Sequence, residues 1–243
     1  MDSFPWESRL DKKFIKGELK KDPSASRSEW LAEWREDIES AFDPAMVDLA
    51  VIPGRGSLPP VDGLRYRAFT DPSGGRGDAW TLAVGHYTRE GIMTVDLLKA
   101  WRPPFDPVSV TAEVVNFLKS YGLKRVVGDK YGGSWPSASF QRLGITYESC
   151  SLPKSQLYLD FMPLLNSRKV ELPEDKRLVV ELKSLERRRG KSGKDTVDHP
   201  PRGHDDRANA VAGLAYLFQK RRGGGIVSGA KLIYQGYGEP SPE

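Results

Sequence analysis

The chain has 243 residues, of which 38% are hydrophobic and 29% charged, proportions typical of a globular protein with one substantial core. Its net charge of +4 and pI near 9.0 are compatible with a polyanionic partner. Cys150 is the only cysteine, which excludes an intrachain disulfide framework and favours a small core residue over a nucleophile. Residues 1–20 contain no continuous hydrophobic stretch, so we expect no signal peptide, no membrane span and a cytoplasmic protein.

Residues 1–62 differ in character from the rest of the chain. A helix-start signal, Asp-Pro-Ser at 22–24, precedes apolar residues at helical spacing and predicts an amphipathic helix. Residues 52–60 are rich in proline and glycine, which predicts a linker. We therefore expect an N-terminal helical and linker segment. The apolar residues at helical spacing are Trp30, Leu31, Trp34, Ile38 and Phe42.

An α/β pattern begins at residue 63. Three β-prone runs, one ending at Asp71 and the others over 80–87 and 91–100, predict an antiparallel meander. The helices and strands that follow alternate, which predicts parallel pairing and hence a mixed sheet. Residues 174–185 fit either a helix or a strand. The other predicted elements are helices over 108–121, 137–143, 155–165 and 206–219, strands over 123–129 and 145–152, and a charged hairpin tip over 187–195.

Acidic residues fall where three of these elements begin or end. Asp71 ends the first strand before Pro-Ser-Gly-Gly, Asp129 ends a later strand before Lys-Tyr-Gly-Gly, and the pair Asp205-Asp206 opens the last helix. If the first and fourth strands pair in parallel, Asp71 and Asp129 emerge at the same sheet edge. A cluster of carboxylate oxygens suits Mg²⁺ or Mn²⁺ rather than zinc. The sequence therefore predicts a metal-dependent phosphoryl-transfer enzyme.

We expect the converging carboxylates to hold two divalent ions that act together. Asp71 is expected to bridge both ions, Asp129 to bind one and Asp206 the other, with Asp205 as an outer partner or as the ligand in place of Asp206. Taken singly, each aspartate has a simpler explanation, because strand-end aspartates are common in turns and acidic residues favour helix N-termini. The prediction depends on their combination.

Basic residues and histidines near these positions supply further candidates. His204 is expected to hydrogen-bond a carboxylate or the scissile phosphate. A zinc site at His199 and His204 is not expected, because no cysteine thiolate lies near them. A basic tip is predicted to follow DNA backbone phosphates without reading sequence. The predicted DNA contacts are Arg187, Arg188, Arg189, Lys191, Lys194 and Arg202.

The sequence resembles the C-terminal nuclease domain of the large terminase subunit of tailed bacteriophages. The resemblance spans about residues 61–220, and its most specific segment is DHPPRGHDDRANA at 198–210. It implies an RNase H-like α/β fold, a mixed sheet with helices on both faces, over 63–222, followed by a flexible tail at 223–243. The other segments that carry the resemblance are FTDPSGGRGD at 69–78, GDKYGG at 128–133 and KSQLY at 154–158.

The resemblance implies an endonuclease that cuts double-stranded viral DNA during genome packaging with two Mg²⁺ or Mn²⁺ ions. It implies an acidic triad of Asp71, Asp129 and Asp206, with Asp205 a close contender, and partners that include the packaging ATPase domain, the portal and the small terminase subunit. No Walker A loop is found, so an isolated nuclease domain or a lost motor is expected. The alternatives are another RNase H-like nuclease, such as a junction resolvase or hybrid hydrolase, and a non-catalytic DNA-binding assembly module.

Overall fold

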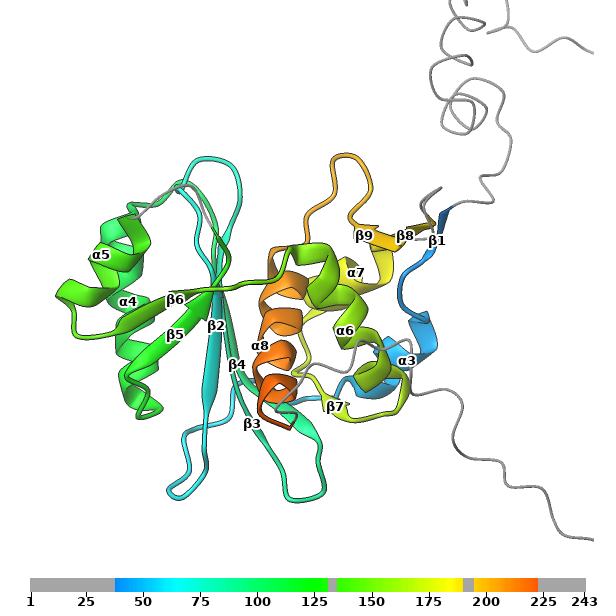
Figure 1. The fold of residues 1–243 in the computed structure, drawn as a ribbon, viewed down its shortest axis with the longest axis horizontal. Coiled ribbons are helices and arrows are strands. Elements are labelled where there is room, and N and C mark those ends of the chain that lie inside the picture. Colours follow the sequence, from blue (N-terminus) through cyan, green and yellow to red (C-terminus); the bar gives the residue numbers. More distant parts are fainter. Residues whose placement is uncertain (1–37, 131–134, 190–194, 223–243) are drawn as a thin grey trace, which may run out of the picture. The chain divides into compact units, whose positions relative to one another are not determined.

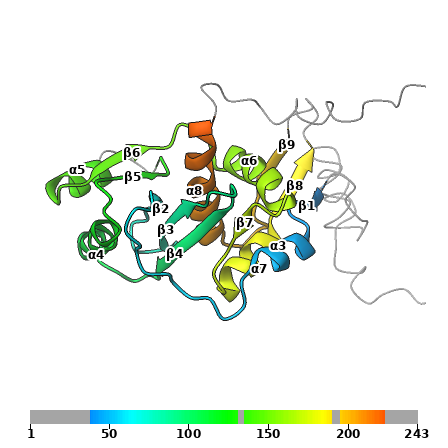
Figure 2. The same cartoon turned by 90° about the horizontal axis from the view of Figure 1, so that it is seen from below.

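The computed structural model describes residues 38–130, 135–189 and 195–222 (Figures 1 and 2). These residues divide into two compact units. The described part of the smaller unit consists of residues 38–39, 187–189 and 195, and the larger unit begins at Ser40 and contains the other described residues. Three short strands, in the order β1-β8-β9, form a small sheet. They are β1 (Ile38–Ser40), β8 (Glu186–Arg189) and β9 (Asp195–Asp198).

The larger unit is built on a six-stranded sheet in the order β6-β5-β2-β3-β4-β7. Strands β2, β3 and β4 form an antiparallel meander, while β5, β6 and β7 pair in parallel with their neighbours. This arrangement confirms the predicted mixed sheet, including the central β5–β2 pair. The strands are β2 (Arg67–Asp71), β3 (Trp80–Tyr87), β4 (Met93–Trp101), β5 (Arg125–Gly128), β6 (Thr146–Ser149) and β7 (Val170–Glu171).

Helices cover both faces of this sheet. Figure 1 shows α4 and α5 on one face and α6, α7 and α8 on the other, and each face has its own buried apolar cluster. Among the helices of the described ranges, none combines the length and apolar content that a membrane span requires. The helices are α3 (Pro44–Ala50), α4 (Pro107–Ser120), α5 (Trp135–Arg142), α6 (Lys154–Asn166), α7 (Lys176–Ser184) and α8 (Asp206–Arg222).

Several elements differ from the sequence-based expectation. The helical spacing that continues to Phe42 is broken by strand β1, so an amphipathic helix does not reach that residue. The other residues of the predicted N-terminal helix lie outside the described ranges. The ambiguous stretch 174–185 is the helix α7, which begins where the Asp175 carboxylate accepts the backbone N–H groups of Arg177 and Leu178 at 2.9 Å each. Short elements such as α3 and β7 gave no distinct sequence pattern.

Helix α8 lies close against the middle of the sheet, and this contact positions the acidic residues. An added Cβ at Gly213 would come within 2.5 Å of the Phe69 ring, so glycine allows the helix to approach β2. The Thr81 hydroxyl on β3 donates to the Asp206 carbonyl at 2.8 Å, and the Arg67 guanidinium at the start of β2 donates to the Leu217 carbonyl. The helix therefore runs antiparallel to β2 and begins beside the end of that strand.

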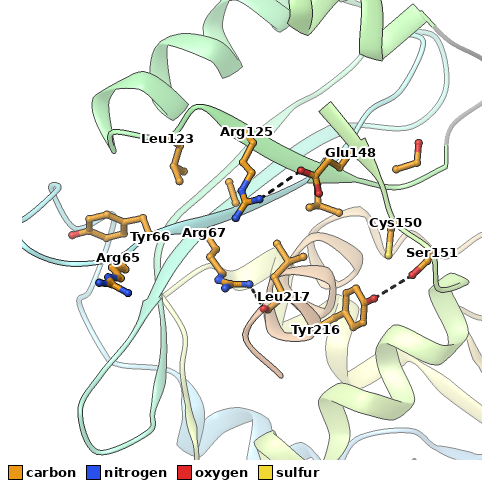
Figure 3. A pocket seen from close by; sticks show the side chains of 13 residues that line it. Arg65, Tyr66, Arg67, Leu123, Arg125, Glu148, Cys150, Ser151, Tyr216 and Leu217 are labelled. Atoms are coloured by element: carbon orange, nitrogen blue, oxygen red, sulfur yellow. Dashed lines mark hydrogen bonds and ion pairs between the residues drawn. The ribbon is translucent and has the colours of Figure 1, made fainter. Parts of the chain in front are cut away.

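A pocket of about 430 Å³ opens beside the C-terminal half of α8, over β5 and β6 (Figure 3). Its floor includes Ala68, Val127 and Cys150, and Tyr216 and Leu217 of α8 form a wall. Helix α8 packs on β2, β3 and β4, so β5 and β6 are left less covered on this face.

Candidate active site

Asp71 and Asp129 lie side by side at one edge of the sheet. Strands β2 and β5 are parallel, and Thr70 pairs with Gly128, so the next residue on each strand emerges at the same level. The Asn209 side-chain amide on α8 lies between the two carboxylates. Its Nδ2 donates to Asp71 Oδ2 at 2.8 Å and to Asp129 Oδ2 at 3.2 Å. The parallel pairing predicted from the sequence therefore brings the two aspartates together.

Asp206 and Asp205 reach this edge from the start of α8, but their contacts differ. Among the described residues, Asp206 Oδ2 accepts one hydrogen bond, a long one of 3.4 Å from the Ala79 backbone N–H. Asp205 Oδ2 accepts from the Tyr158 hydroxyl at 2.8 Å and lies 2.9 Å from Lys154 Nζ. Both carboxylates are buried. Asp205 is thus already neutralised by a cation, and Asp206 retains more unused acceptor capacity.

Glu181 of α7 fixes the first turn of α8. Its buried Oε2 accepts the backbone N–H groups of Arg207 and Ala208 at 2.8 and 3.1 Å. These N–H groups have no partner within the helix, so the carboxylate caps the helix and favourably meets its positive end. Burial raises the pKa of Glu181 to about 7, against the opposing effect of these two hydrogen bonds and of Arg207. The cap holds the turn that carries Asp205 and Asp206.

The electrostatics of the site show that carboxylates are crowded here. Burial raises the pKa of Asp71 to about 8, the hydrogen bond from Asn209 opposes the rise, and the charges of Asp129, Asp206 and Asp205 add to it. Burial also raises the pKa of Asp206, with contributions from nearby acidic groups and an opposing hydrogen bond from the Ala79 N–H. Crowded carboxylates of this kind are stabilised in their charged form by a bound cation.

The raised pKa of Asp71 predicts how the metal-free protein responds to pH. Between the ordinary value of 3.8 and about 8, the folded protein keeps this proton while the unfolded chain has lost it, so stability falls as pH rises through that range. In EDTA, the free energy of unfolding of wild type should fall relative to Asp71→Asn by up to about 1.4 kcal/mol per pH unit. Denaturant unfolding of both proteins from pH 5 to 8 measures this difference. Parallel stability curves would contradict it.

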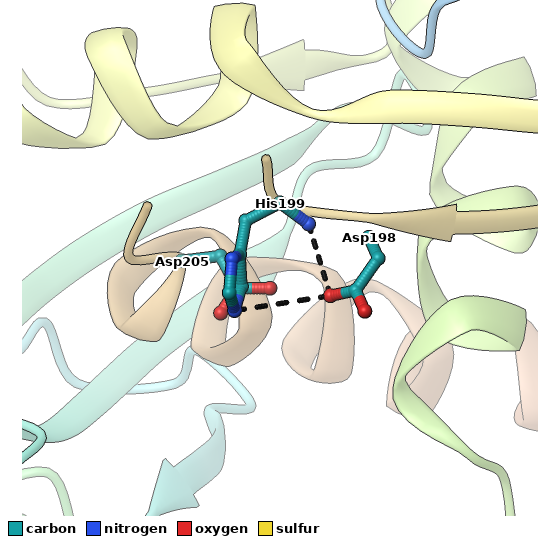
Figure 4. A group of neighbouring side chains, drawn as sticks. All are labelled: Asp198, His199 and Asp205. Atoms are coloured by element: carbon teal, nitrogen blue, oxygen red, sulfur yellow. Dashed lines mark hydrogen bonds and ion pairs between the residues drawn. The ribbon is translucent and has the colours of Figure 1, made fainter. Parts of the chain in front are cut away.

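A second group of potential ligands lies beside the first. In the described part of the chain, one set of three metal-ligating side chains has its ligand atoms within 4.8 Å of one another, namely Asp198, His199 and Asp205 (Figure 4). Lys154 Nζ, however, lies 3.2 Å from Asp198 Oδ1 and 2.9 Å from Asp205 Oδ2. The lysine ammonium therefore already supplies the positive charge between these two carboxylates.

The remaining sequence candidates are more dispersed. His204 is half exposed, and its Nδ1 lies 3.8 Å from Asp78 Oδ1. Its charge also acts on the Asp206 carboxylate and opposes the rise in the pKa of that group. Arg202 is exposed in the turn before α8, with a positive φ of 65°. In the smaller unit, the Arg187 guanidinium pairs with Asp195 across the β8–β9 hairpin. Arg188 and Arg189 lie on β8, and Lys191 and Lys194 fall outside the described residues.

Sequence reasoning missed three polar residues that organise the site. Asn209 bonds two of the aspartates, and Lys154 and Tyr158 hold Asp205. A signal existed for Asn209, because it follows Asp206 by three positions and Asp205 by four, which places it on the same face of a helix. Lys154 and Tyr158 are far from the aspartates in sequence, and only the packing of α6 against α8 brings them near.

The sheet order, the two strand-end aspartates and the helix that closes the site define an RNase H-like fold. Solved structures with this fold include nuclease domains of bacteriophage large terminases. The nuclease of the thermophilic phage G20c superposes with a TM-score of 0.61 at 23% identity, over 73% of this chain and 97% of that one. The nuclease domain of Thermus phage P74-26 has a TM-score of 0.59 at 21% identity, over 77% and 98% of the two chains.

Other similar structures include a longer terminase and nuclease domains with bound metal ions. The large terminase of phage HK97 has a TM-score of 0.60 at 12% identity, and the match covers 86% of this chain and 51% of that one. The G20c nuclease is also known with magnesium, cobalt or zinc bound. No family model matches the sequence, and no curated protein matches it. The chain therefore has the fold of the terminase nuclease domains.

Proposed function

We propose that this protein is a metal-dependent endonuclease that cleaves double-stranded viral DNA during genome packaging. The observation that carries the proposal is the meeting of Asp71 and Asp129 on adjacent parallel strands, bonded by Asn209 of the helix that also brings Asp206. The pKa values of Asp71 and Asp206 are raised, and such perturbed carboxylates at one edge of an α/β sheet are typical of a catalytic site. The shared fold with terminase nuclease domains supports the same reaction class.

The residues present fit a pair of Mg²⁺ or Mn²⁺ ions. All donors are oxygens, which such hard cations prefer. Asn209 Oδ1 is buried without a hydrogen-bond partner in the described structure, so it is a further oxygen donor available at the site. Asp71 would bind both ions, Asp129 one of them and Asp206 the other. When bound, the ions would supply Lewis-acid activation of water and neutralise charge on the phosphate.

The chain itself contributes positioning and charge. Asn209 fixes the spacing of Asp71 and Asp129, and the Glu181 cap fixes the turn that presents Asp206. Asp205 acts through its partners: it holds Lys154 and Tyr158 near the site, where the ammonium offsets part of the negative charge. We therefore assign Asp205 as a positioning residue and Asp206 as the ligand.

The larger assembly is proposed from the same neighbours. We propose that residues 63–222 form the nuclease and 223–243 a C-terminal tail. Residues 1–62 would lead from a packaging ATPase domain into the nuclease, with the part from Ser40 packed in the same compact unit. The proposal of a further domain is supported by the HK97 large terminase, because this chain matches only 51% of its length. The portal and the small terminase subunit would then be partners of the assembled motor in the host cytoplasm.

Nicking of supercoiled plasmid by the purified chain tests the proposal. With millimolar Mn²⁺ or Mg²⁺ we expect conversion to open-circular and linear forms, and with EDTA we expect none. Single-stranded and RNA–DNA hybrid substrates in the same assay separate a duplex DNA endonuclease from a hybrid hydrolase. DNA binding without cleavage in either metal would instead identify a non-catalytic assembly module and overturn the proposed function.

A further inference from the structure

The pocket beside the C-terminal half of α8 carries three arginines. Arg65 precedes β2, and Arg67 and Arg125 are the first residues of β2 and β5. Figure 3 shows Arg67 and Arg125 reaching into the same opening from neighbouring strands. Of the described residues that line the pocket, Glu148 alone is acidic, and it lies 3.7 Å from the Arg125 guanidinium. The lining thus keeps an excess of two positive charges.

These arginines share a sheet face with the candidate catalytic aspartates. Side chains alternate along a strand, so Arg125, Val127 and Asp129 point to one face of β5, and Arg67 and Asp71 to the same face of β2. This is the face covered by α8. Phe69 lies between Arg67 and Asp71 on the same side of β2, and it belongs to the apolar cluster that includes residues of α8. Arg67 and Arg125 each lie four residues before the aspartate that ends or follows their strand, or about 13 Å at roughly 3.3 Å per residue, and Arg65 lies two residues further away.

The chemistry of the lining fits a phosphodiester. Arg65 and Arg125 are exposed, and a guanidinium presents a planar set of donors that matches phosphate oxygens. Ser149 and Ser151 also line the pocket, and Ser151 Oγ is 3.2 Å from the Tyr216 hydroxyl. A duplex whose scissile phosphate lies at the aspartates carries further phosphates within this distance, because each strand has one about every 3.4 Å of helix axis.

We propose that the pocket formed by Arg65, Arg67 and Arg125 binds a backbone phosphate of DNA on the α8 side of the sheet. The site lies about 13 Å from the candidate metal centre and extends the DNA contact beyond the strand ends. It positions the duplex without reading bases, because arginine contacts to phosphate carry no sequence information. This inference rests on the proposed function, since it takes DNA as the substrate.

A binding experiment in EDTA tests the pocket without cleavage. The variant Arg65→Ala/Arg125→Ala removes the two exposed guanidinium groups and leaves Arg67, which also holds the Leu217 carbonyl. The control Arg89→Ala/Arg142→Ala removes the same charge from exposed positions outside the pocket. Fluorescence anisotropy with a labelled 20-base-pair duplex should show about tenfold weaker binding for the pocket variant, and a log–log salt slope shallower by about one to two, than for the control.

Three results distinguish the failure of this inference from that of the proposed function. Equal affinity and salt slope for the pocket variant and the control would overturn the pocket assignment, even if wild type cuts DNA. If the pocket variant binds DNA more weakly than the control, but wild type does not cut DNA, the pocket assignment would stand and the proposed nuclease function would be overturned. If AMP raises the melting temperature of wild type but not of the pocket variant, and both bind DNA equally well, the pocket would be a free-nucleotide site and the inference would be overturned. Arg65→Lys/Arg125→Lys, which keeps the charge but loses the planar set of donors, should keep the wild-type salt slope and bind DNA more tightly than Arg65→Ala/Arg125→Ala.

Discussion

Replacing Asp71 by asparagine should reduce plasmid nicking by a factor on the order of 10³ at saturating Mn²⁺, because this carboxylate is expected to bind both ions. The substitution keeps the size of the side chain and its contact with Asn209, so the protein should remain folded. Initial rates of nicking, measured alongside thermal melting in EDTA, separate a chemical defect from unfolding.

The matched control for this variant is Asp62→Asn. Asp62 is exposed in the loop before β2, and no hydrogen bond or ion pair is found for it within the described structure. Its replacement changes the net charge by the same amount and should leave nicking within twofold of wild type. Asp71→Asn activity equal to that of the control would exclude Asp71 from the catalytic site.

The second large effect is a difference between adjacent residues. Asp206→Asn should reduce nicking by a factor on the order of 10³, as for a direct ligand, whereas Asp205→Asn should reduce it by about 10- to 100-fold, as for an outer partner. The physical reason is that Asp205 is already engaged by Tyr158 and Lys154, while Asp206 has one long hydrogen bond. Titration of Mn²⁺ in the nicking assay measures both variants.

Metal dependence sharpens this comparison. Asp206→Asn should raise the Mn²⁺ concentration needed for half-maximal activity, because an oxygen ligand with full charge is lost. Lys154→Ala should resemble Asp205→Asn, since each removes one partner of the same ion pair. The reverse order, with Asp205→Asn the more damaging change, would exchange the roles of the two aspartates.

Much of the sheet was predictable from the sequence because its strands have clear local signals. The meander of β2, β3 and β4 follows from three β-prone runs, and the alternation of helices and strands after it predicts parallel pairing. Residue 71 ends β2 and residue 129 follows β5, as their neighbouring turn residues indicated. The proximity of these aspartates needed only the assumption that the first and fourth strands are neighbours.

The rest of the site depends on contacts between distant segments that leave no local pattern. Asn209 lies within a buried helix, and in the sequence it is a single amide in an otherwise apolar stretch. The Glu181 cap depends on the contact between α7 and α8, which are separate segments of the chain. The arginine pocket combines residues from three strands and the C-terminal half of α8, so no continuous basic run marks it. The basic hairpin, in contrast, was conspicuous in sequence, and its role in binding DNA stays a prediction.

The central claim is that Asp71, Asp129 and Asp206 together hold the catalytic ions. Anomalous diffraction from crystals soaked in Mn²⁺ tests it most directly, because manganese is located without assumptions about the protein. We expect two peaks about 3.5–4 Å apart, with an Asp71 oxygen between them and Asp129 and Asp206 on either side. A single peak between Asp198, His199 and Asp205, with Lys154 displaced and Asp71 without metal, would contradict the account.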